Sequence, residues 1–186
     1  ELMFARHSRS SNSDVMRVLP RPGPLRLGIV CGIYPPDIGG PATFAQRLAD
    51  EAVRRDWLVD VLALGNEDRR TTEDGRLHLE TVQRPGSQAR RTIRSVLALR
   101  RLHERCDALW INGLFLENRL AALTRGKSCP YEVTKVVADW AWELSDRRGW
   151  TTETVEAFQD TPRGPLQLLS RLRSWSLKRS DLIVVP

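Results

Sequence analysis

Long apolar runs, paired cysteines and lysine are all scarce in this chain. No apolar stretch approaches the ~20 residues that a membrane-spanning helix needs, and the polar N-terminus lacks the apolar core of a signal peptide. The three cysteines, Cys31, Cys106 and Cys129, show neither metal-ligand spacing nor a CxxC pair. Scattered, unpaired cysteines are typical of reduced thiols in a cytosol. The sequence therefore predicts a cytoplasmic protein, with Cys31 as a small core residue rather than a nucleophile.

Two glycine-rich phosphate-binding motifs are also missing. Gly28 and Gly32 lie too early to form a GxGxxG fingerprint, and no GxxxxGK[ST] sequence is present. The segment 59–64 is followed by Gly65 and Asn66 rather than by an acidic residue, which argues against an oxidoreductase that binds NAD. The lone histidines have no partners at ligand spacing, and no serine, cysteine or paired-carboxylate arrangement indicates hydrolysis. We therefore expect no metal site.

The positive charge comes almost entirely from arginine. The net charge is +6, and lysine occurs only at Lys127, Lys135 and Lys178. This balance favours acidic partners such as nucleic acid, anionic lipid or phosphorylated ligands, although an ordinary solvated, arginine-rich surface explains it equally well. No helix-turn-helix, RNP-like aromatic pattern or zinc spacing supports nucleic-acid binding. Nucleic acid is therefore not an expected partner.

Short apolar strands alternate with amphipathic helices after residue 24. The expected strands are 27–33, 59–64, 76–82, 108–111, 133–137 and 181–185, and the expected helices are 41–53, 87–105, 117–124, 152–159 and 165–179. The helix 87–105 is expected to turn Ile93, Val96, Leu97 and Leu102 inward. Residues 66–75 are predicted to be a loop, and residues 1–24 a disordered tail. This alternation predicts an α/β domain over 25–186, with a Rossmann-like parallel sheet and helices on both faces.

Four short polar or glycine-containing segments follow expected strands. They are Gly39-Gly40, Gly65-Asn66, Asn112-Gly113 and Asp139-Trp140. The carboxyl ends of parallel strands meet at one edge of a sheet, and ligands bind there. Asn112 offers both a donor and an acceptor, which suits hydroxyl recognition, but asparagine is also an ordinary turn residue.

Gly39 and Gly40 turn the chain from the first strand into a helix that is expected to begin at Pro41. The amides of the next three residues, Ala42, Thr43 and Phe44, would then lack intrahelical partners. Such a helix N-terminus is a ready site for a phosphate or a carboxylate. Taken alone, the glycine pair is equally consistent with a plain strand-to-helix turn.

Charged and aromatic residues gather around the strand 133–137. Lys135, Asp139, Trp140 and Glu143 bring together one ammonium group, two carboxylates and an aromatic face. Carboxylates beside aromatic faces are a common way to hold a polar, sugar-like ligand. The alternative is structural: the tryptophans pack the following loop onto the core, and Glu143 acts as a cap or pairs with Arg147 one helical turn on.

Together these segments resemble the N-terminal half of a GT-B glycosyltransferase of the retaining group called family 4. The matching pieces are LGIVCGIYPPDIGGPATFAQRLADEAVRR, VDVLALG, WINGL, VTKVVADWAWE, the Phe158-Gln159 pair and RSWSLKRSDLIVVP. The resemblance implies that this domain receives the acceptor, while a C-terminal domain absent from this chain grips the nucleotide-sugar. The implied partners are a nucleotide-sugar donor and a glycan or lipid-linked acceptor. Arginine-rich helices such as 90–105 would suit peripheral contact with an anionic membrane at the inner leaflet.

The resemblance also implies roles for individual residues. Gly39 and Gly40 match the glycine loop that lies against the donor diphosphate, and Asn112 matches a strand end where many relatives carry a histidine facing the sugar. Asp139 matches the position after the fifth strand, and together with Asn112 it is the expected catalytic residue. The expected acceptor or sugar contacts are Lys135, Trp140 and Glu143.

The implied mechanism is stabilisation of a departing diphosphate by a helix N-terminus and basic groups, with the configuration at the sugar retained. No cofactor is expected, because the nucleotide-sugar is a substrate. The chain alone is expected to be inactive, since half of the cleft lies in the other domain. The alternatives are an inactive fragment and a non-catalytic basic binding module.

Overall fold

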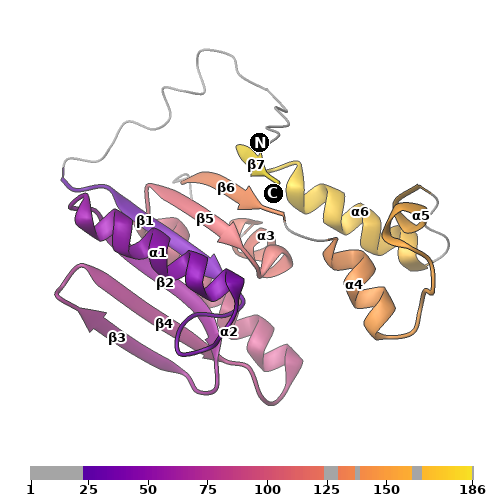
Figure 1. Cartoon of the computed structure of the whole chain (residues 1–186), viewed down its shortest axis with the longest axis horizontal. Helices are drawn as coiled ribbons and strands as arrows, with labels where there is room; N and C mark the ends of the chain where they lie inside the picture. Colours follow the sequence, from indigo (N-terminus) through magenta and orange to yellow (C-terminus); the bar gives the residue numbers. More distant parts are fainter. Residues whose placement is uncertain (1–22, 124–129, 137–138, 161–164, 186) are drawn as a thin grey trace, which may run out of the picture.

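The described part of the chain contains one seven-stranded sheet. The structure is a computed structural model that describes residues 23–123, 130–136, 139–160 and 165–185 (Figure 1), so the predicted disordered tail lies almost wholly outside the described residues. The strand order is β3-β4-β2-β1-β5-β6-β7. The strands are β1 (Arg26–Cys31), β2 (Leu58–Gly65), β3 (Arg69–Glu73), β4 (Leu77–Gln83), β5 (Ala108–Asn112), β6 (Tyr131–Lys135) and β7 (Leu182–Val184).

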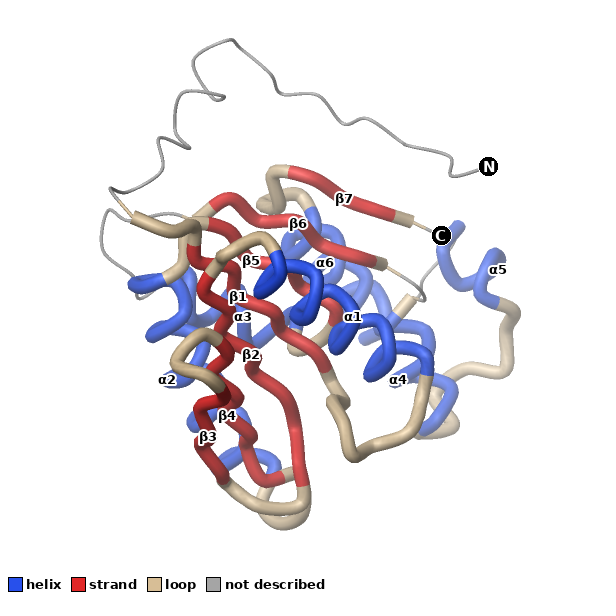
Figure 2. The backbone as a smooth tube through the Cα atoms, turned by 60° about the vertical axis from the view of Figure 1, so that its left-hand side comes forward, coloured by secondary structure: helices blue, strands red, loops and turns tan. Residues whose placement is uncertain are grey.

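Helices cover both faces of this sheet. They are α1 (Gly40–Arg54), α2 (Gln88–Arg105), α3 (Phe115–Leu123), α4 (Trp140–Arg147), α5 (Val155–Asp160) and α6 (Pro165–Leu177). The helix α1 lies on one face, and α2 and α3 lie on the other (Figures 1 and 2). The helix α6 packs on α3, and α4 packs on α6. All strand pairs except β3–β4 are parallel, which confirms the predicted α/β fold.

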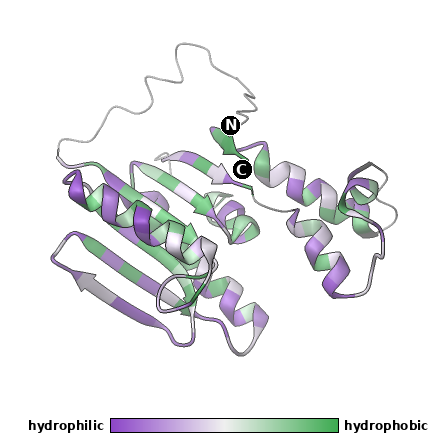
Figure 3. Cartoon of the chain, viewed as in Figure 1, coloured by the Kyte–Doolittle hydropathy of each residue, from purple (hydrophilic) through white to green (hydrophobic). Residues whose placement is uncertain are grey.

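The central strands are buried on both sides because each supplies alternate side chains to two cores. On the α1 side, Ile29 and Val61 pack against Ala45 and Ala49, whose small side chains let the helix approach the sheet. On the other side, apolar residues of the sheet pack against α2 and α3; they include Val30, Leu62, Ile111, Leu99 and Ala121. Figure 3 shows the resulting concentration of hydrophobic residues in the central strands.

Cys31 belongs to the α1-side core, as predicted. Its side chain has no exposed surface, and its thiol lies 3.8 Å from the carbonyl oxygen of Leu62. Burial raises the pKa of the Cys31 thiol to about 12, because a thiolate would lose its hydration there. This environment disfavours a nucleophilic role.

The predicted loop 66–75 is wrong in its central part, because residues 69–73 form β3. This strand pairs antiparallel with β4, and the connecting Asp74 and Gly75 both have positive φ angles (48° and 68°). Such a pair is typical of a tight hairpin turn. The strand escaped prediction because its side chains are polar and mostly exposed, and therefore carry no apolar alternation.

The orientation of α2 also differs from the prediction. Leu102 is buried and Val96 packs against the core, as predicted, but Ile93 and Leu97 are 61% and 52% exposed. Ser95, Ala98 and Leu99 are buried instead. The small side chains of Ser95 and Ala98 allow this stripe of the helix to lie close to the sheet. The outer face of α2 therefore presents two large apolar residues among its arginines.

Candidate functional site

The loop that joins β1 to α1 presents an open helix N-terminus. Gly39 is the N-cap residue, no side chain caps the helix, and Gly40 is exposed. The helix begins at Gly40, one residue earlier than expected, so the amide of Thr43 donates to the carbonyl of Gly39 at 3.0 Å. The prediction that this amide is free is therefore wrong. The amides without an intrahelical partner are those of Gly40 and Ala42, since proline at position 41 has none.

Arg84 anchors this loop, and sequence reasoning missed it. Its Nη2 donates to Asp37 Oδ2 at 2.5 Å and to the carbonyl of Leu64 at 2.9 Å, while its own amide donates to the carbonyl of Gly65 at 2.7 Å. Asp37 lies in the loop, and Leu64 lies near the carboxyl end of β2. The ion pair therefore ties the glycine loop to the edge of the sheet where β2 and β4 end.

Asn112 ends β5 next to the start of the same loop. It pairs in register with Cys31, the last residue of β1. A Cβ atom on Gly113 would lie only 2.9 Å from the backbone nitrogen of Gly32, so the two chain segments touch directly after their strands. The sheet thus brings Asn112 beside the glycine loop, as its position at a strand end predicts.

Lys135 extends from β6 toward the first turns of α1. Its Nζ lies 4.1 Å from the ring centroid of Phe44 in α1, and this ring packs against Trp110 of β5 at 5.4 Å between centroids. Ile111 pairs with Thr134, so the same register sets Asn112 opposite Lys135. The ammonium group therefore lies on the α1 side of the sheet, over the first turns of α1. We call Gly39, Gly40, Asn112 and Lys135 the edge site.

The side chain of Asp139 holds the N-terminus of α4 in place. It is the N-cap of this helix: its Oδ1 accepts from the amides of Ala141 (3.1 Å) and Trp142 (3.3 Å). Its Oδ2 accepts from Gln159 Nε2 at 3.0 Å and from Arg173 Nη1 of α6. The residue is only 7% exposed. Both carboxylate oxygens are thus engaged in holding α4, α5 and α6 together.

Trp140 and Glu143 also lie on α4, a helix that was not among the expected ones. The indole Nε1 of Trp140 is buried and has no hydrogen-bond partner among the described residues. Arg147 donates through Nε to the backbone carbonyl of Glu143 at 3.2 Å rather than to its carboxylate, so the predicted ion pair is wrong. No hydrogen bond or ion pair between described residues joins Asp139, Trp140 or Glu143 to the edge site. Their functional roles stay predictions.

The described residues contain no group of three or more His, Cys, Asp or Glu side chains that could hold a metal ion. Within the same residues, every helix is too short or too polar to cross a membrane. The expectation that no metal takes part stays a prediction.

Comparison with known protein families identifies most of this fold. Residues 39–186 match the family described as "Glycosyl transferase 4-like domain". The matched region begins at Gly39 and includes every residue of the edge site. Among curated proteins, no significant match to the chain is found.

Proposed function

This chain belongs to the glycosyl transferase 4-like family, and from that membership we propose that it forms the acceptor-side half of a retaining enzyme that uses a nucleotide-sugar. The observation that supports a donor-diphosphate site in this half is the uncapped N-terminus of α1, with Gly40 exposed and Lys135 Nζ over the ring of Phe44, about one turn into the helix. A helix N-terminus carries a partial positive charge and free N–H donors, both of which favour an anion. The lysine adds a full positive charge on the same side of the sheet.

The proposed mechanism is stabilisation of charge on the leaving group. As the bond between the sugar carbon and the diphosphate oxygen breaks, the departing diphosphate gains negative charge. The exposed amide of Gly40, together with the ammonium group of Lys135, is proposed to stabilise that charge. The acceptor hydroxyl forms the new bond on the face that the diphosphate leaves, which retains the configuration, and its proton passes to the departing diphosphate.

The remaining predicted residues receive narrower roles in this proposal. Asn112, which stands beside the glycine loop, is proposed to exchange hydrogen bonds with sugar hydroxyls. Because both oxygens of Asp139 are occupied, we assign it to positioning α4, whose Trp140 and Glu143 are proposed to contact the acceptor. The nucleotide is proposed to bind to a further domain of the complete enzyme.

Inorganic pyrophosphate provides a direct test of the donor-diphosphate site. Adding it to the chain is expected to shift the backbone amide signals of Gly40 and Ala42 in ¹⁵N NMR spectra. Lys135→Gln is expected to weaken this binding on the order of 3- to 10-fold, because one charge-assisted contact is lost. Lys178→Gln makes the same charge change at an exposed position beyond α6 and should leave the affinity unchanged.

Two results would contradict this site. One is saturation with pyrophosphate that leaves the Gly40 and Ala42 signals unmoved. The other is an equal loss of affinity in both lysine variants, which would indicate general attraction to a basic chain rather than a local site.

We also propose peripheral contact with an anionic membrane, because α2 exposes Ile93 and Leu97 on the same face as Arg90 and Arg94. Apolar residues flanked by arginines are typical of helices that lie in a membrane interface.

Vesicles with anionic lipid should sediment the chain, and vesicles of phosphatidylcholine alone should not. The variant Ile93→Ser with Leu97→Ser should lose this binding, and salt should weaken it. Absent or salt-insensitive binding would refute the contact.

A further inference from the structure

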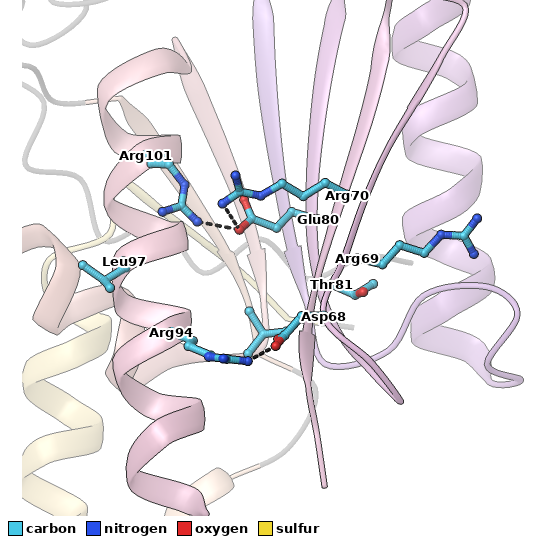
Figure 4. Close-up of a pocket in the computed structure, with 9 residues that line it drawn as sticks. Asp68, Arg69, Arg70, Glu80, Thr81, Arg94, Leu97 and Arg101 are labelled. Atoms are coloured by element: carbon cyan, nitrogen blue, oxygen red, sulfur yellow. Dashed lines mark hydrogen bonds and ion pairs between the residues drawn. The ribbon is translucent and has the colours of Figure 1, made fainter. Parts of the chain in front are cut away.

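A cavity of about 370 Å³ lies between α2 and the β3–β4 hairpin (Figure 4). Its volume falls within the range of roughly 300–1,000 Å³ that is usual for small-molecule pockets. Val82 lines it and belongs to the core on the α2 side, so the sheet separates the cavity from the edge site. Sequence reasoning missed this cavity, because one of its walls is the unexpected strand β3.

Four arginines, two from β3 and two from α2, line the cavity, whereas only two carboxylates do. Arg70 of β3 and Arg101 of α2 donate to the same atom, Glu80 Oε1, at 2.8 Å and 2.5 Å. Arg94 of α2 pairs with Asp68. Figure 4 shows these two clusters side by side, whereas Arg69, the fourth arginine of the lining, points away from them.

This arrangement leaves both charge and hydrogen-bonding capacity unused. Two guanidinium groups share one oxygen of Glu80, so their combined charge exceeds that of their partner. Each guanidinium carries five N–H donors in a planar fork that matches phosphate oxygens. The pairs are weakly held, because Arg70 is 68% exposed and the side chains of Arg101 and Glu80 are 34% and 26% exposed. An anion with two charges can therefore compete with Glu80 for both arginines.

We propose that this cavity binds the phosphoryl group of a small phosphorylated ligand, at a site distinct from the donor site. Arg70 and Arg101 grip the phosphoryl oxygens, and Arg94 adds a third guanidinium group. The charge of Arg94 is balanced by its partner Asp68, so the excess positive charge comes from the two arginines that share Glu80. Leu97 and Val82 supply an apolar wall for the body of the ligand. Soluble phosphate esters and the head groups of phospholipids share this chemistry, and the experiment below distinguishes them.

The test uses two charge changes of opposite sign, each with a matched control on α2. With inorganic phosphate as the probe, followed by calorimetry, Arg101→Gln is expected to weaken binding on the order of 10-fold. Glu80→Gln is expected to strengthen it several-fold, because it releases two guanidinium groups. The controls are Arg100→Gln and Glu104→Gln, whose mutual ion pair lies on α2 outside the cavity lining. Both controls should bind phosphate as the unaltered chain does.

A gain of affinity in Glu80→Gln cannot come from misfolding, which keeps the proposal falsifiable even where Arg101→Gln destabilises the chain. Absence of saturable phosphate binding would overturn the proposal. Equal gains in Glu80→Gln and Glu104→Gln would also overturn it, because they would indicate general charge attraction. In a Lys135→Gln background, which weakens the donor site, Arg101→Gln and Glu80→Gln should still change phosphate binding in the stated directions, so the two proposals fail separately.

The source of the phosphoryl group is decided by comparing glycerol 3-phosphate with vesicles that contain phosphatidic acid. If Arg101→Gln lowers affinity for the soluble ester, the cavity takes soluble ligands. If it lowers binding only to the vesicles, the cavity takes a lipid head group. Either result supports a phosphoryl site, whereas an unchanged response to both probes contradicts it.

Discussion

Replacing Glu132 by alanine is expected to lower the free energy of unfolding by about 3–5 kcal/mol, because the buried positive charge of Arg119 loses its carboxylate partner. Glu132 lies in β6 and pairs through Oε2 with Arg119 of α3, and the two side chains are only 3% and 4% exposed. Asn118 Nδ2 donates to the same oxygen at 3.4 Å, and its Oδ1 lies 2.9 Å from Nε2 of His103 in α2. Without the carboxylate, Arg119 keeps its positive charge in an environment with little water.

The measurement is urea denaturation, with the midpoint expected to fall at an unchanged slope. Arg55→Ala breaks the exposed ion pair with Glu51 on α1 and should cost less than about 1 kcal/mol. Glu132→Gln keeps the shape and a hydrogen-bonding oxygen, so its loss in free energy of unfolding should lie between those of Glu132→Ala and Arg55→Ala. A loss in Glu132→Ala no greater than that in Arg55→Ala would show that the buried pair does not hold β6 to α3.

Gly113→Ala is expected to cost about 2–4 kcal/mol, since it adds a backbone clash to an unfavourable conformation. Gly113 has a φ of 150°, and a Cβ there would lie 2.9 Å from the nitrogen of Gly32 and 3.4 Å from the carbonyl carbon of Cys31. Backbone atoms cannot rotate away as a side chain can. The ends of β1 and β5 would therefore have to separate, and Asn112 would move away from the glycine loop.

Two other glycines separate the causes of this loss in thermal or urea unfolding. Gly86→Ala shares the strain of a positive φ (100°) but meets no atom within 4 Å. Gly32→Ala, on the other side of the same contact, has no such φ and also meets no atom within 4 Å. The expected order of stability loss is Gly113→Ala, then Gly86→Ala, then Gly32→Ala. Equal losses of stability in Gly113→Ala and Gly86→Ala would show that the backbone clash does not contribute to the effect.

The sequence predicts the parts of this fold that depend on apolar burial. The strands β1 and β2 are apolar except for Arg26 and Asp60, and such largely apolar strands occur in parallel sheets with helices on both faces. The polar hairpin strand β3 and the orientation of α2 were beyond this reasoning. The strand β3 depends on the Asp74-Gly75 turn that pairs it with β4. The orientation of α2 depends on the small side chains of Ser95 and Ala98, which let that side of the helix lie close to the sheet.

The edge site was predictable for a topological reason, because parallel strands place Asn112 and Lys135 at one edge beside the glycine loop. Asp139 was expected there too, but its carboxylate caps α4 and pairs with Arg173, which lies 34 residues further along the chain. Pairs at such separations leave no periodic trace in a sequence. The same holds for Arg84 and Asp37, separated by 47 residues, and for the charged cavity beside α2.

The polar strand β3 has a further consequence for how molecules of this chain behave together. It is the outermost strand on its side, so its free backbone groups could extend the sheet into a neighbouring molecule. Charged, exposed side chains on an edge oppose such growth, because pairing with a second strand would strip them of water. Arg69, Arg70 and Glu73 therefore protect this sheet against intermolecular aggregation while contributing little to its core.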